Sequence, residues 1–148
     1  MTFNDQLQLL LEADEGVVCE IYLCSESVPT FGIGHAIKND DPEYGQPVGT
    51  AVSSERIAEA FSLDIESCLE DCRRLYKNFN DMPEMVKLTL ASVAYQIGSP
   101  SLSKFRLMNA ALSGSQWALA ASELRDSRLY RQTTNRTERH AKRLESVA

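Results

Sequence analysis

Several features of exported and membrane proteins are missing from this 148-residue sequence. No apolar run approaches the roughly 20 residues that span a membrane. The N-terminal stretch MTFNDQLQLLLEADEG lacks the basic segment and the small-residue cleavage site of a signal peptide. The sequence also has few aromatic residues (7%), no internal repeat and no low-complexity linker. We therefore expect a protein that is made and folded in the cytoplasm, without stable membrane association.

Cysteine is present but is not arranged as a disulfide framework or a zinc motif. A chain without an export signal usually keeps its thiols reduced, so we expect Cys19, Cys24, Cys68 and Cys72 to be free. Cys68 and Cys72 are four residues apart on a predicted helix, but no CxxC pair accompanies them. The sequence thus predicts neither a metal site nor another cofactor.

The net charge of −6 is divided unevenly along the chain. Residues 1–80 carry 5 Lys/Arg and 15 Asp/Glu, whereas residues 81–148 carry 10 and 6. Nucleic acid is a poor partner, because domains that bind it are usually basic and this sequence has a pI near 4.9. The basic C-terminal half is either a surface for another anionic partner or a solvated helix face.

The hydrophobic pattern predicts a mainly helical α+β fold. Leu7, Leu10 and Leu11 form a helical stripe that should end near Glu15, because Gly16 suits a helix C-terminus. Two β-rich segments with a turn between them predict a hairpin, and a loop follows that could hold one short third strand. The remaining segments are predicted helices. The hairpin segments are 17–24 and 30–37, the short strand 46–48, and the helices about 53–76, 85–96, 102–113, 115–124 and 138–147.

Three residues near the hairpin are candidates for chemistry. Glu15 is separated by eight residues from Cys24, which is separated by five from Thr30, and FGIGH follows. The negative end of a helix disfavours a carboxylate, which suits Glu15 as a proton donor. Spacing alone is weak support, since such a triple also arises by chance.

With its neighbours, this spacing resembles the phage-type lysozymes, the endolysin muramidases that cut bacterial peptidoglycan. The similar segments follow one another along nearly the whole chain. They are DEG with E-x8-C-x5-T and TFGIGH, then VSSERIAEAF with Asp64, AYQIG with Phe105, and Trp117 through SRLYRQTTNR.

The resemblance implies a lysozyme-like fold in one domain, residues 1–148. A small α+β lobe would cover about residues 15–60 and a connecting helix about 53–76. A helical lobe of about 81–148 would carry the N-terminal helix, with the active-site cleft between the lobes. The implied reaction is hydrolysis of the β-1,4 bond between N-acetylmuramic acid and N-acetylglucosamine, by an inverting mechanism.

The resemblance also implies roles for individual residues. Glu15 falls on the catalytic acid and Thr30 on the threonine that places the attacking water. Cys24 falls on a second catalytic position that is commonly aspartate, and this is a departure from the family. A thiol with a reference pKa near 8.5 can serve there as a partial thiolate, although a small buried cysteine would be mere packing.

The resemblance also implies which residues bind the substrate. Tyr95, Gln96, Gly34 and Arg136 are the expected substrate-binding residues, with Arg136 close to the catalytic glutamate; Tyr95 could equally be a core aromatic. His35 should form a structural ion pair with a connecting-helix residue, Asp64. A Cys24–His35 nucleophilic pair is the competing interpretation, but no acyl-transfer motif surrounds either residue.

The expected role is that of a monomeric endolysin in the host bacterial cytoplasm, released to the wall through a separate holin. Peptidoglycan is the expected partner. Two alternatives remain: a peptidoglycan-binding module of the same fold that has lost catalysis, and a delivered, toxin-type muramidase. Cys24 and Thr30 as water-placing groups favour hydrolysis over lytic transglycosylation.

Overall fold

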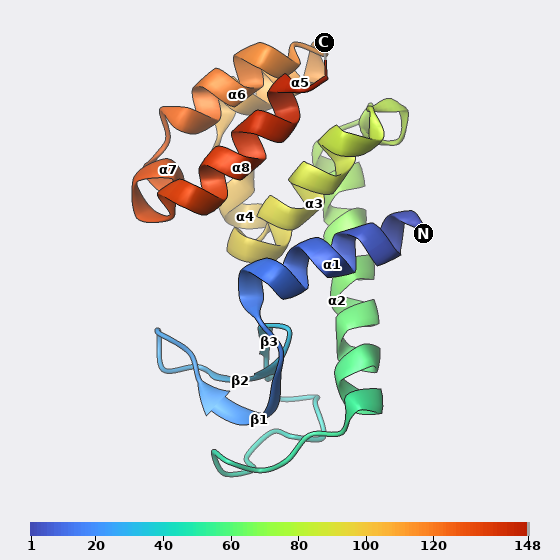
Figure 1. Ribbon diagram of the computed structural model, residues 1–148, viewed down its shortest axis with the longest axis vertical. Helices are drawn as coiled ribbons and strands as arrows, with labels where there is room; N and C mark the ends of the chain where they lie inside the picture. The colour runs from blue at the N-terminus through green and yellow to red at the C-terminus, as the bar shows by residue number, and fades with distance from the viewer. Residues whose placement is uncertain (148) are drawn as a thin grey trace. The chain divides into compact units, whose positions relative to one another are not determined.

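The computed structural model describes residues 1–147 and divides into two compact units. One is residues 8–66, the sheet unit; the other, the helical unit, is residues 1–7 with residues from 67 onward. The boundaries fall inside two helices, α1 (Phe3–Glu15) and α2 (Ser54–Leu75) (Figure 1). The predicted end of the first helix is confirmed. Gly16 has a positive φ of 76° and its N–H donates to the Glu12 carbonyl at 2.9 Å.

The sheet unit contains a three-stranded antiparallel sheet in the order β1 (Val18–Leu23), β2 (Pro29–Gly32), β3 (His35–Ala36). The predicted hairpin is confirmed as β1 and β2. Its second segment, however, is not a single strand as expected, because the chain reverses at Ile33 and Gly34 and returns as β3. Gly32 and Gly34 both have φ of 65°, a left-handed conformation that only glycine adopts without strain.

The predicted third strand at residues 46–48 is wrong, because this segment is a loop. Pro47 has no N–H to donate to a ladder, and Gly45 and Gly49 both have positive φ. The loop nevertheless joins β1 through backbone bonds. The Ile21 N–H donates to the Thr50 carbonyl at 2.9 Å, and the Gly49 N–H donates to the Ile21 carbonyl at 2.8 Å.

The first half of α2 packs on the sheet. Ser53 caps this helix as predicted, because its Oγ accepts the Arg56 N–H at 3.1 Å. A Cβ on Gly32 would lie 3.0 Å from the Ile57 side chain, so the lack of a side chain lets helix and strand approach closely. The apolar side chains buried in this unit are Leu11, Ile21, Phe31, Ile33, Val52, Ile57, Ala60, Phe61 and Ile65.

The helical unit differs from the prediction mainly at helix ends. The predicted helix 102–113 is two helices separated by residues 103–105, and the last helix begins four residues earlier than predicted. The short helix after Ser127, capped by the Ser127 hydroxyl, was missed. The elements are the 3-10 turn η1 (Phe79–Asp81), α3 (Glu84–Ile97), α4 (Ser99–Leu102), α5 (Arg106–Ser113), α6 (Trp117–Arg125), α7 (Arg128–Gln132) and α8 (Thr134–Glu145).

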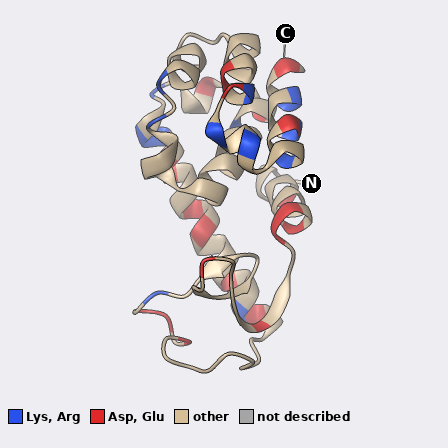
Figure 2. Ribbon diagram, turned by 90° about the vertical axis from the view of Figure 1, so that its left-hand side faces the viewer, with Lys and Arg blue, Asp and Glu red and all other residues tan. Residues whose placement is uncertain are grey.

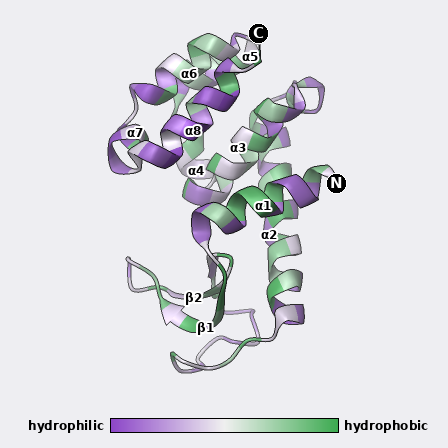
Figure 3. Cartoon of the chain, viewed as in Figure 1, coloured by the Kyte–Doolittle hydropathy of each residue, from purple (hydrophilic) through white to green (hydrophobic). Residues whose placement is uncertain are grey.

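The core of the helical unit forms where α8 packs on α3, α6 and α7. Helix α3 is largely hydrophobic, whereas α8 is mostly hydrophilic (Figure 3). The α8 residues Thr137, His140, Ala141 and Leu144 recur at helical spacing and are buried, so one buried stripe that includes two polar residues holds the helix in place. The mainly helical α+β fold class is thus confirmed. No helix among residues 1–147 combines the length and hydropathy of a membrane span.

Candidate active site

Glu15 is the last residue of α1, where the chain turns into the sheet. The tip of the β2–β3 turn lies directly against it, since a Cβ on Gly34 would be 2.9 Å from Glu15 Oε2. Any side chain at Gly34 would therefore displace the carboxylate or strain a backbone with φ of 65°. Gly34 thus contacts the predicted acid; its predicted contact with substrate stays a prediction.

Cys24 opens the turn between β1 and β2 and is partly exposed. The Glu26 N–H donates to Cys24 Sγ at 3.4 Å, and the Cys24 N–H donates to the Val28 carbonyl at 3.0 Å. The backbone groups of Val28 and Glu26, together with the nearby Thr30 hydroxyl, lower the pKa of the Cys24 thiol. The turn therefore favours the thiolate, which is the form that can accept a proton.

Thr30 lies in β2, opposite Tyr22 of β1, and is buried. Its hydroxyl donates to the Val28 carbonyl at 2.8 Å, which fixes the side chain in the turn that also holds Cys24. The two predicted residues Cys24 and Thr30 therefore belong to one hydrogen-bonded turn.

Tyr22 is a residue of this site that sequence reasoning missed. Burial raises the pKa of its phenol, and the negative charges of Glu15 and Cys24 raise it further. Both ionisable groups of the predicted site thus act electrostatically on Tyr22. The register of the hairpin is the signal that could have suggested this, because Tyr22 pairs with Thr30 across the two strands and such partners share a face of the sheet.

His35, at the start of β3, is buried between two carboxylates. Its Nδ1 lies 2.6 Å from Asp64 Oδ2 and its Nε2 lies 2.8 Å from Asp41 Oδ2. The predicted pair with Asp64 is confirmed, and Asp41 is an unexpected second partner. The hydrogen bond with Asp64 and then that with Asp41 raise the pKa of His35 against the opposing effect of burial. Since both partners accept, His35 must be doubly protonated to satisfy both.

This arrangement argues against the Cys24–His35 nucleophilic pair. Both ring nitrogens of His35 are already engaged by Asp41 and Asp64, so the ring has no nitrogen left to activate a thiol. Arg56 of α2 extends the network by donating to Asp41 and Glu43. His35 therefore links β3 and the following loop to α2, which is a structural role.

The remaining predicted residues belong to the helical unit. Tyr95 and Gln96 are half-buried near the end of α3, and the Gln96 Nε2 donates to Thr133 Oγ1, before α8, at 3.3 Å. Arg136 is half-buried in the first half of α8. The structure thus brings Gln96 to the segment that precedes Arg136. The substrate contacts of these three residues, and the proximity of Arg136 to Glu15, stay predictions.

No metal site accompanies these residues. Within the described part of the chain, no three His, Cys, Asp or Glu side chains are grouped as metal ligands. All four cysteines are free thiols. Among them Cys72 differs most from Cys24, because burial raises its pKa to about 12.

Comparison with known proteins connects this geometry to a family. Residues 12–141 match the family described as Phage lysozyme. The probable T4-type lysozyme 2 of Dictyostelium discoideum is 30% identical over 90% of this chain and 89% of its own length. The probable T4-type lysozyme 1 of the same organism is 25% identical over 88% of each chain.

A third relative is much longer than this chain. The pre-baseplate central spike protein Gp5 of Enterobacteria phage T4 is 27% identical over 92% of this chain but only 27% of its own length. The family match covers most of the chain and includes the turn, the sheet and α2. The chain therefore belongs to the phage lysozyme family and is a glycoside hydrolase of the lysozyme type, a type of enzyme whose substrate is peptidoglycan.

Proposed function

We propose that this lysozyme is an inverting N-acetylmuramidase with Glu15 as its acid and Cys24 as its second catalytic group. The bond cleaved is the β-1,4 linkage between N-acetylmuramic acid and N-acetylglucosamine. The observation that carries the proposal is the hydrogen-bonded turn that holds Cys24 and Thr30, in the same sheet unit as Glu15 and within the matched family region. Two ionisable groups around one site, one to give a proton and one to take it, are what glycoside hydrolysis requires.

Glu15 acts in its protonated form. It gives its proton to the glycosidic oxygen while the bond from that oxygen to the anomeric carbon breaks, and the bonding electrons stay with the leaving oxygen. Gly34 leaves space for the carboxyl group, since an added Cβ would lie 2.9 Å from Glu15 Oε2. The sugar that remains carries a developing positive charge at its anomeric carbon.

Cys24 and Thr30 act on water. A water held by the Thr30 hydroxyl attacks the anomeric carbon from the face opposite the leaving group and passes a proton to the Cys24 thiolate. The thiolate charge also favours the positive transition state. The products are the two sugar ends with one water added across the bond. Glu15 then regains a proton from solvent and Cys24 returns one.

Product analysis tests the reaction. Digested peptidoglycan should give muropeptides with a free reducing N-acetylmuramic acid, and mass spectrometry should show them one water heavier than the anhydro products of a transglycosylase. Products made in ¹⁸O-labelled water should carry the label at the new reducing end. NMR at early times should show that the anomeric configuration at this end is inverted relative to the bond that was cleaved. Anhydro products would overturn the hydrolytic step. The absence of any soluble product would instead support a binding module that has lost catalysis.

For the biological role, we propose a monomeric endolysin that stays in the host bacterial cytoplasm until a holin admits it to the wall. The basic residues of the helical unit, which carries 13 Lys/Arg and 9 Asp/Glu, favour approach to an anionic wall (Figure 2). Cytoplasmic expression in a bacterium should leave the culture growing until a separate holin or chloroform opens the membrane. Lysis without either agent would contradict this role.

A delivered muramidase is the second candidate, and one observation favours it. Nearly the whole chain is similar to part of a phage spike protein, so this fold occurs as a section of a larger assembly protein. Purified protein added from outside, with the outer membrane intact and then permeabilised, separates these roles. A delivered enzyme needs its carrier in the first condition, whereas an endolysin acts from within once a holin is present.

A further inference from the structure

Arg56 of α2 is the only arginine in the sequence of the sheet unit, and its side chain is only 16% exposed. Its Nε and Nη2 donate to the two carboxylate oxygens of Glu43 at 2.8 and 3.0 Å. The same Nη2 donates to Asp41 Oδ1 at 3.0 Å, and Nη1 donates to Glu59 Oε1 at 2.9 Å. The two-point contact with Glu43 fixes the plane of the guanidinium group as well as its position.

These three carboxylates are not equivalent. Glu59 is 67% exposed, so its ion pair contributes little. Glu43 is buried, and its hydrogen bond with Arg56 lowers the pKa of its carboxyl group against the opposing effect of burial. The strong part of the cluster is therefore the link from α2 to the loop that holds Asp41 and Glu43.

One path leads from Arg56 to the candidate acid. The second oxygen of Asp41, Oδ2, lies 2.8 Å from His35 Nε2. His35 directly follows Gly34, and a Cβ on Gly34 would lie 2.9 Å from Glu15 Oε2. Asp41 and His35 thus connect the guanidinium group to the turn that lies against the Glu15 carboxylate.

A second path leads to the residue that is proposed to hold the water. The guanidinium carbon of Arg56 lies 5.6 Å from the centroid of the Phe31 ring, within the range of a cation–π contact. Phe31 is fully buried, directly follows Thr30 and pairs with His35 across β2 and β3. The Phe31 and His35 rings also lie 4.9 Å apart. Arg56 therefore contacts the sheet next to both Thr30 and Gly34.

We propose that Arg56 is a positioning residue for the hydrolysis, which holds the β2–β3 turn so that Glu15 and Thr30 keep their reactive positions. The turn needs such support, because β2 has four residues, β3 has two, and a short isolated hairpin is marginally stable. The donors of Arg56 are directed at protein carboxylates, so it acts through the turn and not on the substrate. This inference rests on the proposed function, since it concerns the acid and the water-placing group of that reaction.

Steady-state kinetics of Arg56→Gln on peptidoglycan test the proposal, at a temperature at which circular dichroism shows a folded protein. The kcat should fall by about tenfold, since a displacement of about 1 Å at a catalytic group can cost up to about a hundredfold. KM should stay within about twofold, because no interaction with the bound substrate is removed. Arg56→Lys keeps the charge but not the planar fork and should lose about threefold in kcat. It replaces Arg56→Gln in every measurement if that variant does not fold.

A double variant distinguishes positioning from a general loss of stability. Gly34→Ala pushes on the Glu15 carboxylate only while the turn is held in place. In Arg56→Gln with Gly34→Ala the turn can move away, so the loss in kcat should be well below the roughly fiftyfold product of the two single losses. The full product would show that the two positions act independently, and would overturn the proposal.

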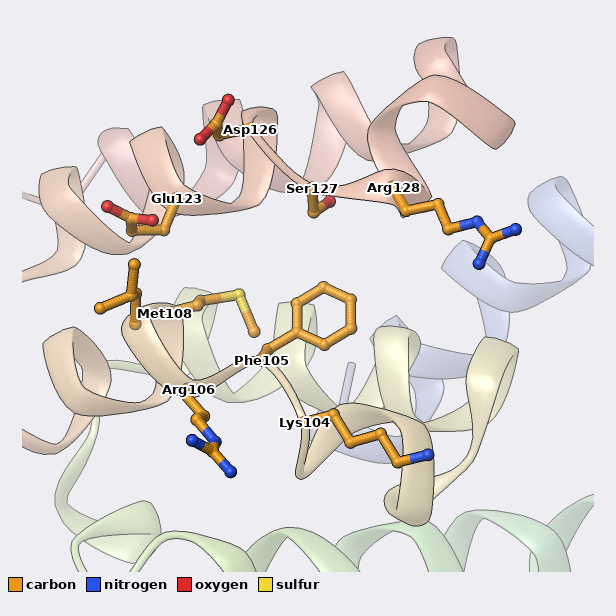
Figure 4. A pocket seen from close by; sticks show the side chains of 9 residues that line it. Lys104, Phe105, Arg106, Met108, Glu123, Asp126, Ser127 and Arg128 are labelled. Carbon is orange, nitrogen blue, oxygen red and sulfur yellow. The ribbon is translucent and has the colours of Figure 1, made fainter.

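Two control variants remove charges that do not hold the turn. Glu59→Gln removes only the exposed partner of Arg56, and Arg106→Gln removes an exposed arginine at the start of α5, in the helical unit (Figure 4). Neither should change kcat. A loss in Arg106→Gln equal to that in Arg56→Gln would mean that only overall charge matters, and would overturn the proposal.

NMR of the protein without substrate separates this inference from the proposed function. Arg56→Gln should shift the backbone amide signals of Gly34 and Thr30, and the two controls should not. If the unchanged protein hydrolyses peptidoglycan but Arg56→Gln leaves kcat or these signals unchanged, the positioning role fails and the muramidase stands. If the signals shift as expected but the unchanged protein cleaves no glycan, the muramidase proposal fails and Arg56 still holds the turn.

Discussion

The sheet unit and the helical unit of this lysozyme differ in their charge and in the kind of secondary structure that positions their side chains. Residues 8–66 carry 2 Lys/Arg and 12 Asp/Glu, whereas the rest of the chain carries 13 and 9. In the sheet unit, the candidate catalytic residues stand on a helix end, a turn and a short strand. In the helical unit, regular helices bury a large apolar core.

This difference indicates that the two units have different functions, one in proton transfer and the other in recognition of the substrate. Turns with positive-φ glycines and backbone hydrogen bonds place single side chains accurately, which suits proton transfer. A basic set of packed helices offers a broad surface, which suits recognition of an anionic polymer. Changes of the candidate catalytic residues in the sheet unit should therefore affect turnover, and exposed changes in the helical unit should affect binding or stability.

Glu15→Gln should have the largest effect. It keeps the size of the side chain but removes the transferable proton, so peptidoglycan hydrolysis should fall by at least about a hundredfold. Clearing of permeabilised Gram-negative cells measures the loss, and circular dichroism should show an unchanged fold. Activity within a few-fold of the unchanged protein would remove Glu15 from the mechanism.

Cys24→Ala should lower turnover by roughly ten- to a hundredfold, because it removes the group that accepts the proton of the water. Cys24→Asp should keep activity and extend it to lower pH, since a carboxyl group ionises near pH 4 and even a thiol with a lowered pKa ionises later. Rates measured from pH 5 to 9 distinguish the variants.

Selective alkylation gives a second check of Cys24. In a background with the other three cysteines replaced, alkylation should block lysis and wall oligosaccharide should protect against it. Equal lysis with cysteine, alanine or an alkylated thiol at position 24 would assign the residue to packing.

Gly34→Ala should lower activity by about fivefold, because the added Cβ would displace the Glu15 carboxylate. The same change strains a left-handed backbone by about 1 kcal/mol. Gly45→Ala is the matched control, since Gly45 has φ of 83° but no atom within 4 Å of an added Cβ. Steady-state rates and thermal melting of both variants separate the two effects, and equal activities would exclude the clash.

His35→Asn should lower stability more than turnover. The raised pKa of His35 means that its stabilisation is fully present below the unfolded pKa of about 6.5 and is lost as pH rises through the higher folded pKa. The difference in melting temperature between variant and unchanged protein should be about 3 °C at pH 6 and smaller at pH 9. An unchanged melting temperature with lost activity would instead indicate that His35 takes part in the reaction.

Arg125→Ala should have the smallest effect. Arg125 donates to Glu138 and Glu145, and it lowers the pKa of Glu138 to about 2, but all three side chains are partly exposed. Exposed ion pairs contribute little and are screened by salt. The melting temperature should fall by roughly 2 °C or less at low salt. The difference should shrink in about 0.5 M salt, where the Debye length is about half of its value in 0.1 M salt.

The sequence predicted the features that depend on local rules. Glycine after a helix, β-branched alternation and a serine cap fixed the end of α1, the first hairpin and the start of α2. It failed where a short segment had two acceptable conformations. Residues 30–37 have the composition of one strand but form two, because Gly32 and Gly34 take left-handed conformations in the folded chain. Helix α7 is too short for periodicity to reveal.

The candidate site divides in the same way. The resemblance to the phage-type lysozymes, carried by short motifs along the sequence, singled out Glu15, Cys24, Thr30 and the pairing of His35 with Asp64. The Asp41 partner and the contact of Gly34 with Glu15 were decided only by the tertiary structure, as was the influence of both ionisable groups on Tyr22. These features join residues from separate elements across short distances in space, and no periodicity or local propensity along the chain encodes such a distance.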